Sequence, residues 1–389
     1  ELARVLSAYT FDHTMVFMLT IGEEQGLFGA EALAEYCTQQ GIPVKAVLNN
    51  DIVGGIYCGN SASPPGCPGA GDIDSLNVRL FSHGGFNSPH KQLARFIKLQ
   101  YQEELTGQIP TEMDLHIMSN EDRTGRGGDH IPFRQNGFSA MRFTSANEHG
   151  DGSPDAQYTD RQHTSDDSLG LDLDNDGDLD TFFVDFNYLA RNAVINGNAA
   201  AMIGIGPETP DFTVTAASGG AEITIITQTQ YSTYRVGVRS VDNDWDSVYT
   251  MAGTLDTLFG LPQGVTVIYS VASVDSNGIE SLFSREKTTT IANLDAPIPG
   301  QMELLQNRPN PFDEQTIISV NVAQRPDFEE AYIRIVDAAG KEVQKIPITL
   351  EMDMNEVYFY HGFHAEGVYF YSLVIDGETW ATRKMVMQR

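Results

Sequence analysis

Two adjacent carboxylates, Glu23 and Glu24, follow an apolar run that extends from residue 14 to residue 21, with Gly22 between them and the run. The run reads Thr-Met-Val-Phe-Met-Leu-Thr-Ile, which predicts a buried strand. Charged side chains at the end of such a strand are costly unless a metal ion or a reaction needs them. We therefore expect an enzyme, and a metal-dependent one.

Asp51 and His163 extend this candidate site. Asp51 ends the strand-like segment 44–51, and His163 precedes Thr-Ser-Asp-Asp. Hydrolysis assisted by paired metal ions needs carboxylate and imidazole ligands on separate strand-end loops, and one further carboxylate that takes a proton from a metal-activated water. Glu23, Glu24, Asp51 and His163 supply these types. Each also has a simpler interpretation: the glutamates as the first turn of a helix, Asp51 as a turn cap and His163 as an exposed loop residue.

The elements that position these residues alternate over residues 1–206. Helix patterns cover 2–9, 30–40, 90–105 and 182–203, and strand patterns cover 14–21, 44–51, 114–118 and 138–143. Such alternation predicts an α/β domain with a mainly parallel sheet. Ligands bind these sheets at the carboxyl ends of the strands, where Glu23, Glu24 and Asp51 fall.

The pattern changes after residue 206. Residues 207–293 form short strand patterns separated by turn residues, which predicts a β-sandwich. A spacer at 293–300 precedes residues 301–389, which are rich in β-branched and aromatic side chains. We expect three domains: 1–206, 207–293 and 301–389.

Composition limits the partners. The 389 residues carry a formal net charge of −29, which argues against nucleic acid or an anionic membrane surface as a partner. No apolar stretch approaches the roughly 20 residues that span a bilayer.

The first residues of the sequence have a helical pattern that begins without a start signal. Leu2, Val5, Leu6 and Tyr9 have helical spacing, and no initiator Met or capping residue precedes them. The sequence therefore predicts a fragment of a longer protein.

The cysteines suggest no zinc finger. Cys58 and Cys67 flank a Gly/Ser/Pro loop, so a disulfide and two separate thiols both remain open. Cys37 lies on a helical pattern and is expected to be a small buried side chain.

Four blocks resemble one enzyme family. They are Gly22–Ala30, Asn50–Gly54, Gly127–Phe133 and Gln162–Asp167. Together they look like the di-zinc exopeptidases that include bacterial leucyl aminopeptidase, aminopeptidase Y and glutamate carboxypeptidase II. The resemblance implies that Glu23 is the general base, that Glu24 and His163 bind one zinc ion, and that Asp51 binds the other. Asp129 and His130 match a block near the active site and have no implied ligand role.

The resemblance also implies two metal ligands upstream of Glu23, a His in a His-x-Asp block and a bridging Asp. The resemblance implies that the parent protein is a secreted zinc-dependent aminopeptidase acting on peptides. Neither upstream ligand has a counterpart in this chain, so we expect the chain itself to be inactive. One alternative is a catalytically dead surface binding or adhesion protein. A lesser alternative is a glutaminyl cyclase, because those enzymes share the fold and a comparable Asp-His-Ile-Pro-Phe stretch.

An acidic stretch predicts a separate cation site. Its carboxylates alternate around Gly177 and are Asp172, Asp174, Asp176, Asp178 and Asp180. This spacing fits the start of a calcium loop, although position twelve is Phe183 rather than an acid. A solvated acidic loop is the other interpretation.

Two further resemblances concern the β-rich part. Residues 267–281 are similar to a late strand and turn of fibronectin type III modules. Residues 304–312, 333–340, 367–374 and 382–386 resemble the sorting domain of type IX secretion cargo. This implies recognition by outer-membrane secretion machinery and an extracellular or cell-surface location. The alternative for this segment is one more accessory sandwich.

Overall fold

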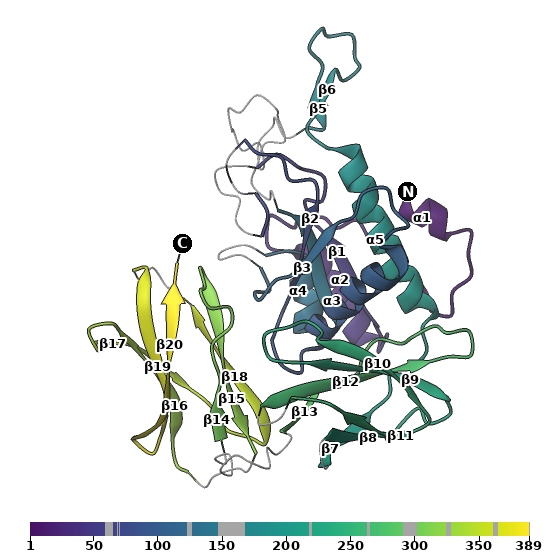
Figure 1. Ribbon diagram of the computed structural model, residues 1–389. Coiled ribbons are helices and arrows are strands. Elements are labelled where there is room, and N and C mark those ends of the chain that lie inside the picture. The colour runs from purple at the N-terminus through teal and green to yellow at the C-terminus, as the bar shows by residue number, and fades with distance from the viewer. Residues whose placement is uncertain are drawn as a thin grey trace. The chain divides into compact units, whose positions relative to one another are not determined.

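The computed structural model describes the whole chain except residues 59–64, 68, 70, 123–126, 147–167, 218–219, 263–264, 291–301, 324–327, 361–364 and 389. Contacts within the chain divide it into two units. The first comprises Glu1–His83, Leu93–Asp122 and Arg126–Gly206. The second comprises Pro207–Arg389 together with the short segment Gly84–Gln92. Figure 1 shows helices only in the part of the chain before residue 207, among the residues described.

Residues 1–206 alternate helices and strands, as their sequence predicts. The helices are α1 (Leu2–Leu6), α2 (Phe28–Gln39), α3 (Pro89–Gln100), the π-helical turn η1 (Tyr101–Leu105), α4 (His130–Gln135) and α5 (Phe186–Ile205). The strands are β1 (Val47–Asn50), β2 (Asn77–Ser82), β3 (Asp114–Ile117), β4 (Ala140–Ser145), β5 (Gly170–Leu171) and β6 (Thr181–Phe182). The first four strands form one sheet, and β5 and β6 form a separate hairpin.

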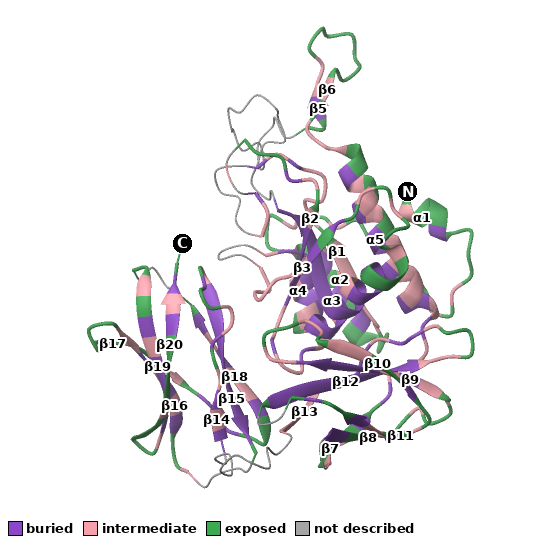
Figure 2. Ribbon diagram, viewed as in Figure 1, coloured by how far each residue is buried: buried purple, intermediate pink, exposed green. Residues whose placement is uncertain are grey.

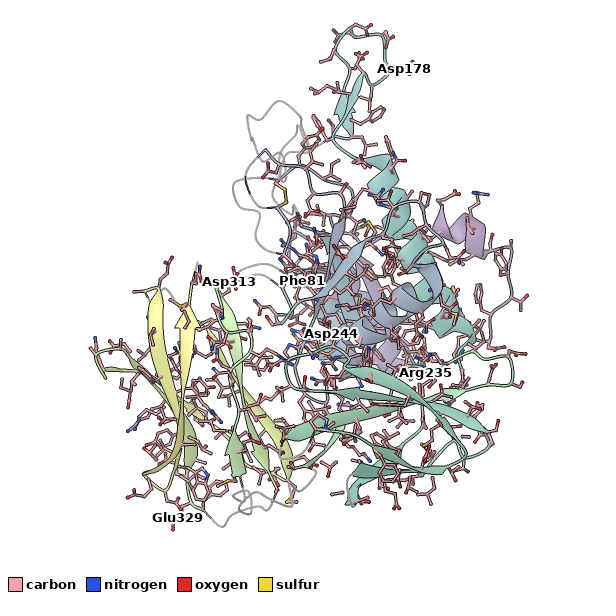
Figure 3. The ribbon with its side chains drawn as sticks, viewed as in Figure 1. Phe81, Asp178, Arg235, Asp244, Asp313 and Glu329 are labelled. Carbon is pink, nitrogen blue, oxygen red and sulfur yellow. A yellow bond between two sulfur atoms is a disulfide. The ribbon has the colours of Figure 1, made fainter. Side chains whose placement is uncertain are left out.

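The central sheet has the order β1-β4-β2-β3 and is mixed rather than mainly parallel. β1 runs parallel to β4 and β2 runs parallel to β3, but β2 and β4 are antiparallel. Strand direction depends on how the connections return the chain to the sheet, which the local side-chain pattern does not encode. Every residue of β4 is buried. Figure 2 shows β2 as largely buried, and Phe81 of β2, labelled in Figure 3, is 1% exposed.

The predicted strand at residues 14–21 is absent. This segment is irregular, and its apolar side chains face solvent: Val16 is 75% exposed, Leu19 98% and Ile21 79%. A strand exists only where a neighbouring strand accepts and donates its backbone hydrogen bonds. Among the described strands, β1 pairs with β4 alone and none pairs with residues 14–21. An apolar composition was therefore not sufficient to make a strand here.

The second unit consists of sheets that pack as sandwiches. Residues 207–290 form β7 (Phe212–Ala217), β8 (Gly220–Ile225), β9 (Thr233–Arg239), β10 (Ser247–Ala252), β11 (Leu255–Phe259), β12 (Thr266–Val274) and β13 (Lys287–Thr290). They make sheets ordered β10-β9-β12-β13 and β11-β8-β7. Their shared core includes Ile223, Tyr234, Val236 and Val271, each fully buried.

The last strands make a further pair of sheets. They are β14 (Met302–Leu304), β15 (Gln315–Val322), β16 (Ala331–Asp337), β17 (Glu342–Pro347), β18 (Asp353–Tyr360), β19 (Gly367–Ile375) and β20 (Glu378–Met387). The sheets are ordered β14-β15-β18 and β17-β16-β19-β20, and Ile318, Ile333, Phe359 and Leu373 pack between them with no exposure. The expected β-sandwich character of residues 207–389 agrees with these sheets.

The structure shows which cysteines are bridged. Cys58 and Cys67 form a disulfide with their α-carbons 5.2 Å apart. Cys37 is a buried free thiol on α2, as its helical position indicated.

Candidate active site

Glu23 and Glu24 lie in the turn that precedes α2, and not at the end of a strand. The carbonyl of Glu23 accepts hydrogen bonds from the backbone N–H of Gly26 at 3.0 Å and of Leu27 at 2.8 Å, which closes the turn. The backbone N–H of Gly29 then bonds to the Ile21 carbonyl at 2.9 Å. Glu23 is half-buried and Glu24 is exposed. The turn thus directs the two carboxylates into different surroundings.

Asp51 directly follows β1, at the carboxyl edge of the sheet. Its backbone N–H bonds to the Phe143 carbonyl of β4 at 3.2 Å. The next residue, Ile52, has a φ of 58°, a left-handed conformation that is an outlier for a β-branched side chain. Its carbonyl accepts hydrogen bonds from the backbone N–H of Ser145 at 2.8 Å and from Thr144 Oγ1 at 3.2 Å. Strain of this kind occurs mostly at functional sites, where the surrounding contacts impose it.

Asp129 and His130 meet the end of β1 at the start of α4. The α-carbon of Gly128 faces three side-chain atoms: a β-carbon there would lie 3.1 Å from Asn49 Nδ2, 3.3 Å from Asp51 Oδ2 and 3.3 Å from His130 Nδ1. Thr20 Oγ1, from the segment before the Glu pair, donates a hydrogen bond to Asp129 Oδ2. The structure therefore brings Asp51, Asp129 and His130 together, and a β-carbon at residue 128 would be tight against the side chains of Asn49, Asp51 and His130.

The pKa of Glu23 depends on the same group of charged side chains. Burial raises the pKa of Glu23, and repulsion from Asp51, Glu24 and Asp129 raises it further. The guanidinium of Arg142 acts in the opposite direction and lowers it. A carboxyl group whose pKa moves toward neutrality is suited to exchange a proton during a reaction. Glu23 therefore lies near enough to Asp51 and Asp129 for their charges to act on its carboxyl group.

His130 is held neutral inside this site. Burial lowers the pKa of His130 to about 4, against the opposing attraction of Glu121. Its Nε2 lies 3.3 Å from the Glu121 carbonyl oxygen, a contact that assigns the ring proton to Nε2 and makes Nδ1 an acceptor. The Glu121 carboxylate is itself paired with Arg134 at 2.7 Å. His130 thus presents an uncharged, proton-accepting nitrogen toward Asn49 and Asp51.

Arg142 also lies in the candidate site, although none of the sequence blocks that suggested the enzyme contains it. It lies on β4, its side chain is 3% exposed, and it contacts both Asp122 and Asp51. Asn49 and Asp122 were missed for the same reason, because each lies outside the blocks that suggested the enzyme. One signal was present: a charge within the apolar strand Ala-Met-Arg-Phe requires a buried partner, just as Glu23 does.

Buried polar atoms of Asn49, Asp129 and His130 have no hydrogen-bond partner among the described residues. They are Asn49 Nδ2, Asp129 Oδ1 and His130 Nδ1, and Arg142 Nε contacts Asp51 as an ion pair without a hydrogen bond. Buried polar groups are nearly always paired, so this concentration of atoms is consistent with a place for a small polar ligand or ion. The carboxylates of Glu23, Glu24 and Asp51 are oxygen donors that zinc accepts. His163 lies outside the described residues, so its place relative to them is not given.

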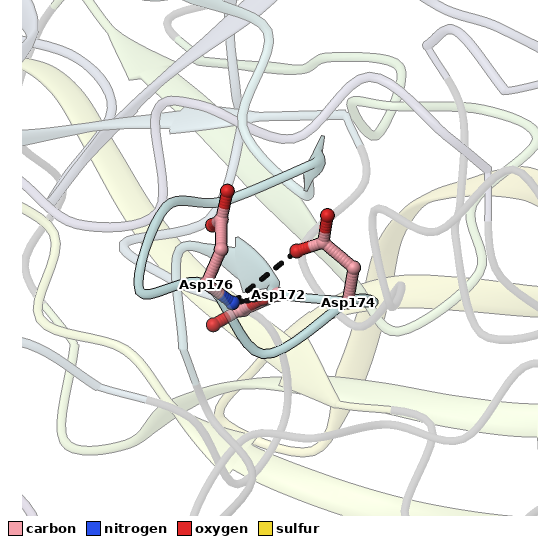
Figure 4. A group of neighbouring side chains, drawn as sticks. All are labelled: Asp172, Asp174 and Asp176. Carbon is pink, nitrogen blue, oxygen red and sulfur yellow. Dashed lines mark hydrogen bonds between the residues drawn. The ribbon is translucent and has the colours of Figure 1, made fainter.

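The acidic loop between β5 and β6 is compact. Ligand oxygens of Asp172, Asp174 and Asp176 lie within 4.8 Å of one another (Figure 4). The backbone N–H of Gly177 bonds to Asp172 Oδ2 at 2.9 Å, and Gly177 has a φ of 99°, which lets the loop turn sharply. Figure 3 shows Asp178 at the tip of this loop. In the described part of the chain, this is the one group of three acidic or metal-binding side chains drawn so close.

Two family models match the chain, one near each end. Residues 1–65 match the family model for peptidase family M28, and residues 308–388 match the model for a secretion-system C-terminal sorting domain. The sorting domain marks the protein as secreted or held at the cell surface. Within the described residues, no helix is long and apolar enough to cross a membrane.

Fungal proteins are similar to the chain. It is 31% identical over 218 residues to a probable zinc metalloprotease of Pyrenophora tritici-repentis, covering 54% of this chain and 46% of that protein. It is 33% identical over 210 residues to a probable zinc metalloprotease of Pyricularia oryzae, covering 51% of this chain and 39% of that protein. The chain thus spans less than half the length of these relatives. The expected inactivity of the chain has no support in these findings.

Proposed function

Because the chain joins part of a peptidase family M28 domain to a secretion-system sorting domain, we propose that the protein is an exported zinc-dependent aminopeptidase. Its substrates are peptides, from which it removes N-terminal residues. The observation that carries the proposal is the group formed by Glu23, Asp51, Asp129 and Arg142, in which burial and neighbouring carboxylates raise the pKa of Glu23. A mixed α/β peptidase domain over residues 1–206 supports this group.

Each residue of the group has a role in this proposal. A carboxylate oxygen of Glu23 takes a proton from the attacking water and passes it to the leaving amine. Glu24 and His163 hold one zinc ion and Asp51 holds a second. Zinc, when bound, supplies a Lewis acid for the scissile carbonyl and lowers the pKa of water. Asp129 and His130 line the site without serving as ligands.

The last domain serves export in this proposal. Residues 301–389 form the sandwich that outer-membrane type IX secretion machinery recognises. Residues 207–293 form a fibronectin type III-like sandwich between the peptidase domain and the sorting domain. The sheets β10-β9-β12-β13 and β11-β8-β7 support the second assignment.

The decisive experiment measures release of aminoacyl groups by the purified full-length protein. Peptides with varied N-terminal residues, including glutamine, are incubated with the zinc-loaded protein, with chelator-treated protein and with Glu23→Gln. We expect release that the chelator removes and that Glu23→Gln lowers by about 10² to 10⁴. Loss of ammonia from N-terminal glutamine without peptide cleavage would instead indicate a glutaminyl cyclase. No turnover of any peptide by the zinc-loaded protein would favour a surface binding protein.

We also propose that the acidic loop binds calcium and stabilises the β5–β6 hairpin before α5. The close approach of Asp172, Asp174 and Asp176 supports this role. Calorimetric titration of the metal-free protein with calcium tests it, with Asp174→Asn as the variant and magnesium as the competing ion. We expect calcium binding that Asp174→Asn weakens at least tenfold, and a loop that is merely solvated would give no heat of binding.

A further inference from the structure

Arg142 is a buried cation that joins separate parts of the candidate site. Its Nη1 donates a hydrogen bond to Asp122 Oδ2 at 2.5 Å, and its Nε lies 3.2 Å from Asp51 Oδ2. The same Nη1 lies 3.3 Å from the Gly127 carbonyl oxygen. One guanidinium thus contacts the end of β1, the loop after β3 and the turn before α4.

The two carboxylate partners of Arg142 differ in exposure. Asp122 is 4% exposed, whereas Asp51 is 31% exposed. A buried guanidinium destabilises the fold unless a buried counter-charge lies beside it, and the Asp122 carboxylate lies at hydrogen-bond distance from Nη1. The contact with Asp51 is longer, and Asp51 reaches toward solvent at the edge where Glu23 lies. Asp122 therefore anchors the guanidinium, and the guanidinium in turn restrains Asp51.

The planar guanidinium carries this restraint as a rigid body. Because the group is planar, Nη1 bonded to Asp122 also fixes the position of Nε, which lies against Asp51 Oδ2 as an ion pair rather than as a hydrogen bond. Gly128 lies near the same oxygen, since a β-carbon built there would lie 3.3 Å from Asp51 Oδ2. The Asp51 carboxylate is thus close to both the guanidinium and the turn that precedes α4.

We propose that Arg142, anchored by Asp122, is a positioning residue that fixes the orientation of the Asp51 carboxylate for metal binding. The inference rests on the proposed function and deepens it, because it names the group that aligns one of the proposed ligands. Groups that hydrogen-bond to metal ligands typically change metal affinity by about 10- to 100-fold when they are altered. Lysine at this position keeps the positive charge and loses the planar group that contacts Asp122 and Asp51 at the same time.

The test measures zinc affinity of the full-length protein by competition with a chromophoric chelator, at a temperature where every variant is folded by circular dichroism. We expect Arg142→Lys to weaken binding of one zinc ion by about tenfold or more. Arg134→Lys is the matched control, because Arg134 pairs with Glu121 at 2.7 Å in the same unit and has no contact with Asp51 among those described. It should leave zinc affinity unchanged.

A double variant separates positioning from general damage. If Arg142 acts through Asp51, Arg142→Lys adds no further loss of zinc affinity once Asp51→Asn is present. The positioning role also predicts a lower kcat with little change in KM for Arg142→Lys. Asp122→Asn, which keeps Arg142 and weakens its anchor, should lower zinc affinity in the same direction and provides a second route if Arg142→Lys does not fold.

The outcomes distinguish the two proposals. Unchanged zinc affinity in folded Arg142→Lys and Asp122→Asn, with wild-type zinc binding intact, would overturn the positioning role and leave the peptidase proposal standing. Additive losses in the double variant would likewise overturn it, because the effect would not pass through Asp51. Failure of the wild-type protein to bind zinc would overturn both.

Discussion

Two buried arginines, one in each unit, have opposite surroundings. Arg239 at the end of β9 is 1% exposed and binds Glu286, also 1% exposed, through Nε at 2.6 Å and Nη2 at 3.0 Å. Its Nη1 donates to the Ser240 carbonyl at 3.0 Å. Arg142 is just as buried, but it divides its contacts between Asp122 and the partly exposed Asp51.

The neighbours of the two arginines also differ. Glu286 Oε2 accepts a further hydrogen bond from the backbone N–H of Asn87 at 2.7 Å, so that pair is well supplied with partners. Beside Arg142, polar atoms of Asn49, Asp129 and His130 are buried without a partner among the described residues. A closed bidentate pair holds a fold together, whereas polar atoms left unsatisfied around a shared cation indicate a site built for something else.

The largest expected effect is on catalysis. Glu23→Gln removes the proton acceptor but changes little of the volume of a half-buried side chain, so the fold should persist. We expect kcat for aminoacyl release to fall by about 10² to 10⁴, measured at saturating zinc. A Glu23→Gln protein with wild-type kcat would show that the proton passes through another group.

Breaking the buried ion pair between Arg239 and Glu286 should lower the free energy of unfolding. Arg239→Met leaves Glu286 buried without its counter-charge, and such a loss typically costs about 3 to 5 kcal/mol. Urea unfolding followed by tryptophan fluorescence measures it. Replacing both partners, in Arg239→Met with Glu286→Leu, should restore much of the lost stability, because no buried charge then remains. If the single variant unfolds at the wild-type urea concentration, the contrast between the two arginines is wrong.

A paired carboxylate next to the site should make stability depend on pH. Burial raises the pKa of Glu121, but hydrogen bonds from His83 and Arg134 outweigh it and bring the pKa to about 2. Because the folded pKa is depressed, the stabilisation is complete above the unfolded value of 4.5 and is lost as pH falls toward 2. We expect about 1 to 3 kcal/mol to be lost over that range.

Denaturant unfolding at several pH values, compared with Glu121→Gln, measures this contribution. The variant lacks the titrating carboxylate, so the difference in unfolding free energy between it and the wild type should shrink as the solution is acidified below pH 4.5. A difference that stays constant across this range would mean that Glu121 titrates alike in the folded and unfolded chain.

The smallest effect concerns backbone strain beside Asp51. Ile52 has a φ of 58°, and a left-handed conformation costs an L-residue roughly 1 to 2 kcal/mol. Asparagine tolerates this conformation, so Ile52→Asn should change stability by less than about 1 kcal/mol after its lost packing is included. Thermal unfolding measures it. Destabilisation well beyond that amount would show that side-chain packing, and not strain, dominates at Ile52.

Much of the local structure could be predicted from the sequence. The patterns at 30–40, 114–118 and 182–203 correspond to α2, β3 and α5, because the spacing of apolar side chains is a local property. The segment 14–21 has a comparable apolar pattern, yet it is irregular and exposed. Its failure shows that a strand requires hydrogen-bonding neighbours, which a single segment cannot specify.

Some residues of the candidate site could also be proposed from the sequence, whereas others could be assigned only from the structure. Glu23 and Asp51 could be proposed from residue type and position in the chain, and Asp129 and His130 from the resemblance to the di-zinc exopeptidases. Arg142 could not be assigned to them, because its partners Asp51 and Asp122 are 91 and 20 residues away in the chain. The role of Gly128 was also hidden, since it follows from side chains that converge from β1 and α4.

The sequence by itself determined the chemistry on offer: paired carboxylates before a helix, a strand that ends in Asp51, and an acidic loop around Gly177. These depend on residue types and on spacings of a few residues. Only the tertiary structure decided which charges meet, which way β2 runs, and that Arg142 lies between Asp122 and Asp51. Those outcomes follow from contacts between distant segments, whose free energies local patterns do not contain.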